Sequence, residues 1–379
     1  MKVAIVHDWL TGMRGGEKTL EVFLDLLPDA RLFTLVHDRG KLSAQIESTP
    51  IRTSFIQRLP FGVSRYRYYL PLMPAAVERF DLTPFDLVLS LSHCVAKGVI
   101  TRPDAVHICY CFTPMRYAWE SYHRYFGDHR IGWMGRFLLP PLFTYLRMWD
   151  VASAHRVDHF IAVSEAVARR IKKYYGRDSA VLPCPVETGR FQASAGGDYY
   201  LIASAFAPYK RIDLAIDAFN TLGYPLRIVG GGQDETRLRA LAGKNIEFLG
   251  WLTGQDLVEQ YEGCKAFLLP GEEDFGIAPV EAMAAGRPVI ALGKGGALET
   301  VIPFDDPEGR DPTGVHFSEE SAESLAEAVR SFERIAHLFE PARVRAHAQR
   351  YDVLAFRRAA EDILRGVVPS LERESKLRV

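Results

Sequence analysis

Short apolar runs alternate with amphipathic segments through most of the chain. In the first half the runs cover residues 2–7, 32–36, 86–91, 106–111 and 160–163, and in the second half 199–203, 226–229, 246–249, 266–269 and 288–292. Runs of this length without polar alternation are typical of parallel strands that are covered on both faces. The pattern therefore predicts two series of buried strands.

The segments between these runs predict helices. Residues 16–27 place Leu20, Phe23, Leu24 and Leu27 on one stripe, which is the spacing of an amphipathic helix. Alternating strands and helices predict doubly wound α/β units. Residues 182–198 contain two prolines and a glycine pair and predict a hinge linker, while residues 351–364 predict a C-terminal amphipathic helix.

Composition excludes several classes of protein. The 379 residues carry a formal net charge of -1, which gives no reason to expect nucleic acid as a partner. The five cysteines show no zinc-site spacing and indicate a reducing compartment. The N-terminus turns polar too soon for a signal peptide, and the longest apolar stretch, residues 137–146, contains two prolines and is too short to span a bilayer. We expect a cytoplasmic protein, soluble or peripheral on the inner face of a membrane, without a metal site.

The most informative stretch is residues 270–289. Glu273 and Asp274 follow a strand, so they are expected at its C-terminal end, where ligand sites of α/β proteins form. Pro279 is expected early in a short helix that ends before Gly286. Glu281 is expected in the first turn of that helix. A solvated acidic loop and a carboxylate that caps the helix would explain the same residues without a ligand.

The whole string resembles the paired-glutamate signature of the family 4 retaining glycosyltransferases. These GT-B enzymes include many bacterial mannosyltransferases, and their two glutamates stand eight positions apart, as Glu273 and Glu281 do. The resemblance implies that Glu273 contacts the hydroxyls of the donor sugar and that Glu281 contacts the ribose. Carboxylates suit both tasks because they accept hydrogen bonds from adjacent hydroxyls. The rest of the implied donor-binding loop comprises Asp274, Phe275, Gly276 and Ile277. The amides of the last three would face the diphosphate.

A second matching segment follows the first strand of the second half. Lys210 and Arg211 resemble the basic motif with which the family neutralises the departing diphosphate. The family's second cation, a few residues upstream, is replaced here by Ala205, and Arg211 is the candidate to compensate. Gly231 matches a family position near the nucleotide.

The first half carries weaker matches. Gly15 and Gly16 resemble the family's first-domain glycine loop, where the lack of a Cβ lets backbone approach the donor. Phe112 stands where related enzymes carry a histidine that hydrogen-bonds the transferred sugar, and Arg116 is a candidate for binding an anionic group of the acceptor. His7 and His93 end or follow strands, so they are either site residues or structural histidines.

Taken together, the resemblance implies an α/β protein of the GT-B fold, with two Rossmann-like domains facing an interdomain cleft. Residues 1–188 would bind the acceptor, residues 189–352 the nucleotide sugar, and residues 353–379 would form a helix that crosses back to the first domain. The expected reaction is a metal-independent, retaining transfer of a hexose, with no cofactor beyond the nucleotide-sugar co-substrate. GDP-mannose is the first candidate donor, and the candidate acceptor is a saccharide or a polyprenyl-diphosphate-linked saccharide of O-antigen or exopolysaccharide synthesis. A nucleotide-sugar 2-epimerase and a catalytically impaired nucleotide-sugar-binding protein stay open as alternatives.

Two stretches mix basic and aromatic residues. One is residues 65–69, and the other runs from residue 116 to residue 149 and includes Tyr122, Tyr125, Phe126, Trp133, Arg136, Phe137 and Arg147. Segments of this composition suit an anionic membrane surface. An ordinary cover over the first-domain sheet explains them equally well.

Overall fold

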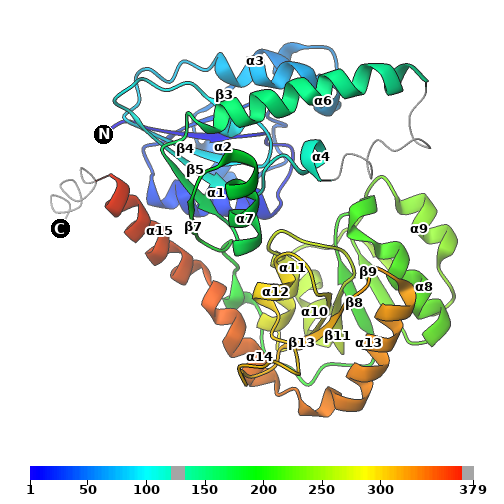
Figure 1. Cartoon of the computed structure of the whole chain (residues 1–379). Helices are drawn as coiled ribbons and strands as arrows, with labels where there is room; N and C mark the ends of the chain where they lie inside the picture. Colours follow the sequence, from blue (N-terminus) through cyan, green and yellow to red (C-terminus); the bar gives the residue numbers. More distant parts are fainter. Residues whose placement is uncertain (121–132, 369–379) are drawn as a thin grey trace. The chain divides into compact units, whose positions relative to one another are not determined.

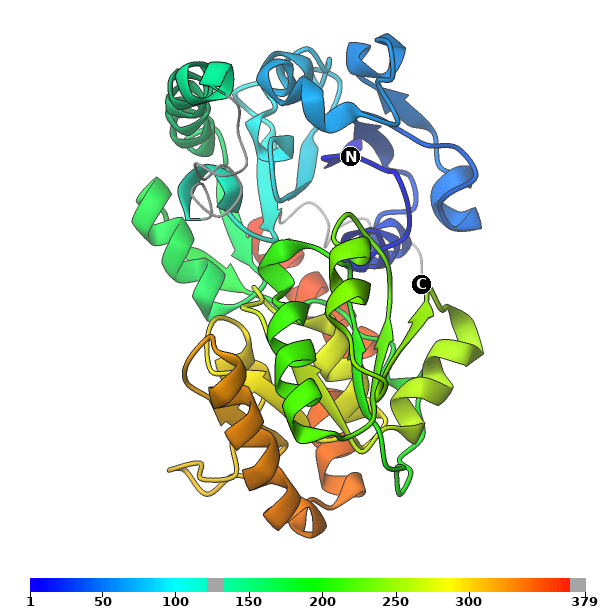
Figure 2. The same cartoon turned by 90° about the vertical axis from the view of Figure 1, so that its right-hand side faces the viewer.

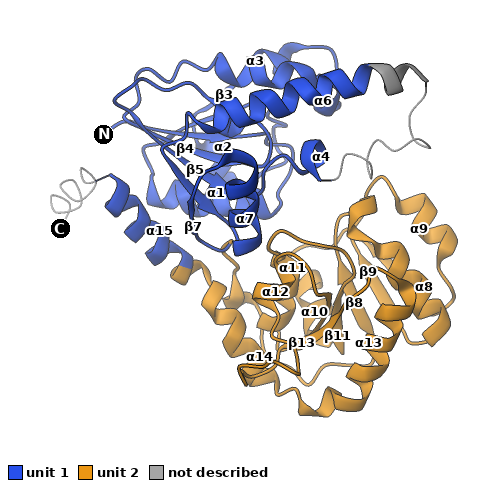
Figure 3. Ribbon diagram, in the orientation of Figure 1, with its two compact units in different colours: residues 1–183, 356–379 blue, residues 184–355 orange. Residues whose placement is uncertain are grey.

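The computed structural model describes residues 1–120 and 133–368, without the side chains of residues 133–137. The chain forms two compact units (Figure 3). Unit 1 comprises residues 1–183 together with the end of the chain from residue 356, and unit 2 comprises residues 184–355. Within the described ranges, none of the helices is long and apolar enough to cross a membrane.

Unit 1 is built on a parallel sheet with the strand order β3-β2-β1-β4-β5-β6-β7. The strands are β1 (Val3–His7), β2 (Arg31–Thr34), β3 (Ile51–Thr53), β4 (Leu87–Ser92), β5 (Val106–Cys111), β6 (His159–Ala162) and β7 (Ser179–Val181). The apolar runs of the first half predicted five of these strands but not β3 or β7. Both are three-residue edge strands with partly exposed side chains, so neither produces an apolar run.

Helices cover both faces of this sheet (Figure 1). They are α1 (Gly15–Leu26), α2 (Ala44–Ser48), α3 (Met73–Glu78), α4 (Arg116–Trp119), α6 (Trp133–Ala154), α7 (Glu165–Tyr175) and α15 (Val353–Val367), with 3-10 turns η1 (Phe55–Arg58), η2 (Tyr66–Leu72) and η3 (Ala96–Gly98). Residues of α3 and α6 share one core with Ala4 and Val6 of β1. On the other face Phe23 of α1 packs edge-on against Phe356 of α15, with ring centroids 5.4 Å apart. The observed α1 confirms the helix expected over residues 16–27.

Unit 2 repeats the plan with the strand order β10-β9-β8-β11-β12-β13, again all parallel. Its strands are β8 (Tyr200–Ala203), β9 (Leu226–Val229), β10 (Ile246–Gly250), β11 (Ala266–Leu269), β12 (Val289–Leu292) and β13 (Gly314–Phe317). Its helices are α8 (Ile212–Leu222), α9 (Glu235–Leu241), α10 (Gly254–Gly263), α11 (Ile277–Ala284), α12 (Ala297–Thr300), α13 (Ala322–Ile335) and α14 (Pro341–Ala348), with 3-10 turns η4 (Thr188–Arg190), η5 (Pro208–Lys210), η6 (Ala336–Leu338) and η7 (Gln349–Tyr351). Helices α8 and α13 lie side by side on one face (Figure 2).

Each sheet has one point at which the strand order reverses. In unit 2 the first strand, β8, lies beside β11, and in unit 1 the first strand, β1, lies beside β4. The connections after these strands leave toward opposite sides, which opens a crevice at the carboxyl ends of the strands, where open α/β sheets bind ligands. In unit 2 the loops that border this crevice are residues 204–211 after β8 and residues 270–276 after β11.

Candidate functional site

The acidic loop leads into a helix whose start is set by a glycine. Gly276 caps α11 with a φ of 92°, a left-handed conformation that glycine adopts without strain. Pro279 is the third helical residue, and Gly286 follows the end of the helix with a φ of 74°, so both expectations are confirmed. The placement of Glu281 in the first turn was wrong. The helix starts two residues before Pro279, so Glu281 is its fifth residue and lies in the second turn.

The two loops at the crevice of unit 2 are joined by an ion pair between Lys210 Nζ and Glu273 Oε1. Both side chains are mostly buried, with 17% and 19% of their surface exposed. Burial by itself would lower the pKa of Lys210, but the neighbouring Glu273 carboxylate outweighs burial and raises this pKa above its ordinary value. Lys210 is therefore an ammonium ion at neutral pH and carries fixed positive charge at the crevice.

The close approach of these loops depends on Gly271. A Cβ at this position would lie 2.6 Å from the carbonyl oxygen of Tyr209 and 2.8 Å from backbone atoms of Lys210. Both contacts are shorter than real carbon contacts and involve backbone, so a side chain at residue 271 would push the loops apart. The sequence signal is the glycine directly after Pro270, which the sequence analysis did not single out.

Arg211 is held apart from this pair. Its Nη1 donates to Glu320 Oε1 at 2.7 Å and its Nε donates to Asp213 Oδ1 at 3.3 Å. Arg211 is the single residue between η5 and α8, and its backbone has a φ of 52°. Burial lowers the pKa of Arg211, but the bond to Glu320 and the charge of Asp213 raise it overall. The structure thus brings Lys210 to Glu273 and turns Arg211 toward two other carboxylates.

Glu281 is buried, with 8% of the residue exposed, and its Oε2 accepts a hydrogen bond of 2.9 Å from the hydroxyl of Tyr261 on α10. Burial, together with the adjacent Glu281 carboxylate, raises the pKa of Tyr261 far above its ordinary value, so the hydroxyl stays protonated and donates. Sequence reasoning missed Tyr261. Its only signal in the sequence was a tyrosine on the apolar stripe of the helix before β11, and such a position usually indicates a core residue.

Two glycine loops complete this edge of unit 2. After β12, the amide of Gly296 donates to the carbonyl oxygen of Glu273 at 2.8 Å, which ties the loop of residues 293–296 to the acidic loop. After β9, the carbonyl oxygen of Gly231 accepts from the amide of Phe206 at 2.9 Å. Gly231 was expected at the site, whereas the loop after β12 was missed, although its three glycines were a usable signal.

In unit 1, Gly16, Phe112 and His7 lie together at the carboxyl edge of the sheet. A Cβ at Gly16 would lie 3.4 Å from His7 Nε2 and 3.6 Å from the ring of Phe112. His7 Nδ1 lies 3.0 Å from the carbonyl oxygen of Trp9, so Nδ1 carries the proton and Nε2 is left as an acceptor. Among the described residues Nε2 has no hydrogen-bond partner. Gly15 is the first residue of α1.

The loops after β1 and β4 are joined by a carboxylate that the sequence analysis overlooked. Asp8 is fully buried and accepts hydrogen bonds from four consecutive amides, those of residues 93–96, at 2.7 to 2.9 Å. Hydrogen bonds to a charged carboxylate are stronger than hydrogen bonds between neutral groups. Asp8 therefore holds together the two loops that border the crevice of unit 1, as the Lys210–Glu273 pair does for the loops of unit 2.

Arg116 begins α4, and its Nε lies 3.9 Å from Glu120 Oε2. Glu120 also binds Arg170 Nε at 2.8 Å, so the charge of Arg116 is shared with a local ion-pair cluster.

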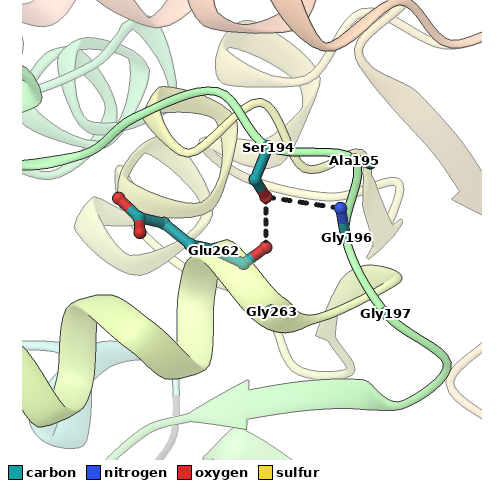
Figure 4. A pocket seen from close by; sticks show the side chains of 6 residues that line it. All are labelled: Ser194, Ala195, Gly196, Gly197, Glu262 and Gly263. Atoms are coloured by element: carbon teal, nitrogen blue, oxygen red, sulfur yellow. Dashed lines mark hydrogen bonds between the residues drawn. The ribbon is translucent and has the colours of Figure 1, made fainter.

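A surface hollow of unit 2 is not part of this site (Figure 4). It is lined by Ser194, Ala195, Gly196, Gly197, Glu262 and Gly263. These residues precede β8 and β11, so they lie at the amino ends of the strands, opposite the acidic loop. Their polar atoms bind each other, since the Ser194 hydroxyl donates to the Glu262 carbonyl at 2.5 Å and accepts from the Gly196 amide at 3.3 Å.

Comparison with known proteins gives two family matches. Residues 189–349 match the model described as glycosyl transferases group 1, and residues 29–190 match the model described as glycosyltransferase family 4. Together the two matches run from residue 29 to residue 349. They confirm the resemblance on which the sequence analysis relied.

Individual relatives match over part of their length. A GDP-mannose-dependent monoacylated α-(1-6)-phosphatidylinositol monomannoside mannosyltransferase of Corynebacterium glutamicum is 31% identical over 208 residues, which cover 46% of this chain and 53% of that protein. The O-antigen chain mannosyltransferase C of Escherichia coli is 28% identical over 155 residues, covering 36% of this chain and 42% of that protein. The chain thus spans about half the length of these relatives.

The fold has a solved counterpart. The crystal structure of Anabaena HepE in complex with UDP has a TM-score of 0.68 at 16% sequence identity and covers 97% of this chain and 100% of that chain. This similarity confirms the expected GT-B fold with two parallel α/β sheets. With the fold and both family matches in agreement, the chain belongs to the family 4, group 1 glycosyltransferases.

Proposed function

We propose that this chain is a retaining hexosyltransferase whose unit 2 binds a nucleoside diphosphate sugar. The observation that carries the proposal is the Lys210–Glu273 ion pair across the strand-order reversal of unit 2. A sugar diphosphate offers a partner to each member of the pair, because its phosphates bind the ammonium ion and its sugar hydroxyls donate to the carboxylate.

The role of Lys210 follows from its charge. A group with a raised pKa holds its proton at neutral pH, so Lys210 does not act as a general base. It serves instead as a preorganised positive charge beside the diphosphate, whose negative charge grows as the glycosidic bond breaks. In a retaining reaction on the front face of the sugar, a donor phosphate oxygen takes the acceptor proton, and no protein base is needed.

The remaining donor contacts follow the same edge of unit 2. The amides of residues 275–277 open α11 and would face the diphosphate, with Asp274 beside them. Glu281, held by Tyr261, would take the ribose hydroxyls. On this assignment residues 189–352 form the donor domain and residues 1–188 the acceptor domain, where Gly15, Gly16, Phe112 and Arg116 would contact substrate and residues 353–379 would return to the acceptor domain.

For the substrates we propose GDP-mannose as the donor and, as acceptor, a saccharide or polyprenyl-diphosphate-linked saccharide of surface polysaccharide synthesis. Support comes from the names of the relatives, which include a GDP-mannose-dependent enzyme and an O-antigen mannosyltransferase. The enzyme would then act at the cytoplasmic face of the inner membrane, where a lipid-linked acceptor is found.

One observation favours a second candidate, a nucleotide-sugar-binding protein with impaired turnover. Arg211 was the candidate to replace the cation missing at Ala205, but its guanidinium is bound to Glu320 and Asp213. Release of nucleoside diphosphate in the presence of a lipid-linked acceptor distinguishes the two functions. Free sugar formed without any acceptor would instead favour the epimerase class.

The donor site is tested by thermal shift with GDP, UDP and their sugar conjugates. A ligand that binds only the folded state at one hundred times its Kd stabilises that state by about 2.7 kcal/mol. We expect a rise in Tm with a guanine or uracil diphosphate and no rise for Glu281→Ala. Glu333→Ala is the matched control, because Glu333 also accepts from a buried tyrosine, Tyr200, at 2.6 Å. A wild-type protein that responds to none of these nucleotides would refute the donor site.

A further inference from the structure

Residues 48–77 of unit 1 contain no acidic residue, although acidic and basic residues are balanced over the whole chain. The segment carries four arginines, all exposed: Arg52, Arg58, Arg65 and Arg67. It contains β3, η1, η2 and the first turn of α3. This part of the surface is therefore positive, with no neighbouring carboxylate of its own segment to neutralise it.

The same segment exposes large apolar side chains. The exposed fractions are 68% for Phe61, 80% for Tyr68 and 43% for Leu72. Tyr66, between them, is buried in the core that η2 and α3 share with α6. Tyr66 therefore belongs to an ordinary cover over the sheet, which is one of the two interpretations of this stretch. Phe61 and Tyr68 face solvent instead.

Phe61 is held outward by a constrained turn. Its φ is 57°, which is unusual for a residue with a bulky side chain. The turn is fixed by hydrogen bonds of 2.8 Å from the Gly62 amide to the Leu59 carbonyl and from the Arg65 amide to the Phe61 carbonyl. The strained backbone and the exposure of an aromatic ring to water each lower the stability of the protein. Their combination indicates that the ring has a binding role.

Helix α6 adds a second set of exposed apolar side chains. Leu138, Tyr145 and Met148 are exposed to 67%, 46% and 69%. Residues 133–149 contain arginines but no acidic residue. Figures 1 and 2 show α3 and α6 on the same side of the unit 1 sheet, and both contribute to the core that contains Tyr66.

Other aromatic residues of the second stretch do not contribute to this surface. Trp149 is buried against that core, and Trp119 stacks on Tyr174 at 4.6 Å and donates to Asp150 at 2.8 Å. Tyr122, Tyr125 and Phe126 lie outside the described residues, as do the side chains of Trp133, Arg136 and Phe137.

We propose that residues 58–72 of unit 1, together with the exposed side of α6, dock onto the surface of an anionic lipid bilayer. Phe61, Tyr68 and Leu72 would enter the interfacial layer, where aromatic side chains with one apolar and one wet side are favoured. Arg58, Arg65 and Arg67 would bind lipid phosphates, because guanidinium groups recognise phosphate oxygens in pairs. This docking does not require any particular donor sugar, and it places the protein where the lipid-linked acceptor of the proposed function resides.

The test is sedimentation of the full chain with vesicles. We expect binding to vesicles that mix phosphatidylglycerol with phosphatidylcholine, about tenfold weaker binding to pure phosphatidylcholine, and weaker binding at high salt. The double substitution Phe61→Ser with Tyr68→Ser, and the charge variant Arg65→Gln with Arg67→Gln, are each expected to weaken binding at least tenfold. Trp251→Ser is the matched control, because Trp251 is 62% exposed in unit 2 and should not affect binding.

The proposal is overturned if the wild-type chain stays in the supernatant with anionic vesicles, which is the result expected if this surface instead binds a protein partner. It is also overturned if both double variants sediment like the wild type, or if Trp251→Ser weakens binding to the same extent as they do. The nucleotide-induced shift in Tm, measured on the same variants, should be unchanged. A failure of docking is therefore distinguishable from a failure of the donor site.

Discussion

At the scale of single residues, the hydrogen bond from Tyr261 to Glu281 is the contact that most directly controls a proposed ligand-binding group. It fixes one carboxylate oxygen of a buried glutamate and so sets the direction of the other. The Tyr261 ring is held in turn by Phe267 of β11 and Phe191, with ring centroids 5.7 Å and 5.6 Å away. The tyrosine thus acts on a ligand only through Glu281.

We predict that Tyr261→Phe weakens nucleotide binding about tenfold while the protein stays folded. A hydrogen bond to a charged group contributes roughly 1.5 to 3 kcal/mol, and its loss frees the carboxylate to rotate. Titration calorimetry with the nucleotide that gives the largest thermal shift measures the effect.

Tyr200→Phe provides the control for this experiment. Tyr200 is equally buried and donates to Glu333, but it packs against Phe219 and Phe332 on the opposite face of the sheet. Its loss should lower Tm without changing nucleotide affinity. Equal affinity in wild type and Tyr261→Phe would show that the bond is structural only.

Some residues of the candidate site could be identified from the sequence, where the spacing of residues indicates a chemical role. The family resemblance, which rests on the eight-residue separation of Glu273 and Glu281 and on the lysine after β8, nominated these residues. The structure brings two of them, Lys210 and Glu273, together at one edge of unit 2. The sequence did not show which partners these side chains would contact. Arg211 and Lys210 are adjacent in sequence, but they bind carboxylates from different loops because Arg211 adopts a left-handed backbone.

At the scale of elements, β1 and β5 of unit 1 each carry a buried histidine that stays neutral. Burial, followed by the charge of His93, lowers the pKa of His7 to about 4. Burial lowers the pKa of His107 to about 4 as well, against the opposing effect of its contact with the Arg156 carbonyl. Glu17 of α1 behaves in the opposite sense, because burial raises its pKa to about 7.

These pKa values predict that unit 1 loses stability as the pH falls from about 6.5 to 4. In this range the unfolded histidines bind protons that the folded ones do not, so protonation favours unfolding. Each histidine contributes on the order of 3 kcal/mol over the full range. Glu17 opposes them, since its folded form binds a proton between pH 7 and 4.5, but one group does not offset two.

Urea unfolding followed by tryptophan fluorescence at several pH values measures this loss, because four of the five tryptophans lie in unit 1. His107→Gln should unfold with a weaker dependence on pH than the wild type. A free energy of unfolding that stays constant or rises between pH 6.5 and 4 would contradict the assignment.

The sequence predicted central elements better than edge elements. Buried strands such as β1 and β11 have uniformly apolar side chains and were found, whereas β3, β7 and β13 lie at or near the edges of their sheets and have mixed exposure. The start of α11 was misplaced for a related reason. Proline is tolerated throughout the first helical turn, so Pro279 marked the turn but not its first residue.

At the scale of the whole molecule, the two units share one design. Each is a parallel sheet with a reversal of strand order, and in each the loops beside that reversal are joined by a carboxylate. It belongs to the fully buried Asp8 in unit 1 and to the mostly buried Glu273 in unit 2. Asp8 accepts hydrogen bonds from four backbone amides, whereas the carboxylate of Glu273 pairs with the ammonium group of a side chain, Lys210. This difference supports the proposal that the sugar diphosphate binds unit 2.

The most direct test of this assignment is a crystal structure of the protein soaked with the nucleoside diphosphate that gives the largest thermal shift. We expect phosphate oxygens within hydrogen-bond distance of Lys210 Nζ and of the amides of residues 275–277, with the ribose against Glu281. Nucleotide bound elsewhere, with the Lys210–Glu273 pair and Glu281 untouched, would contradict it.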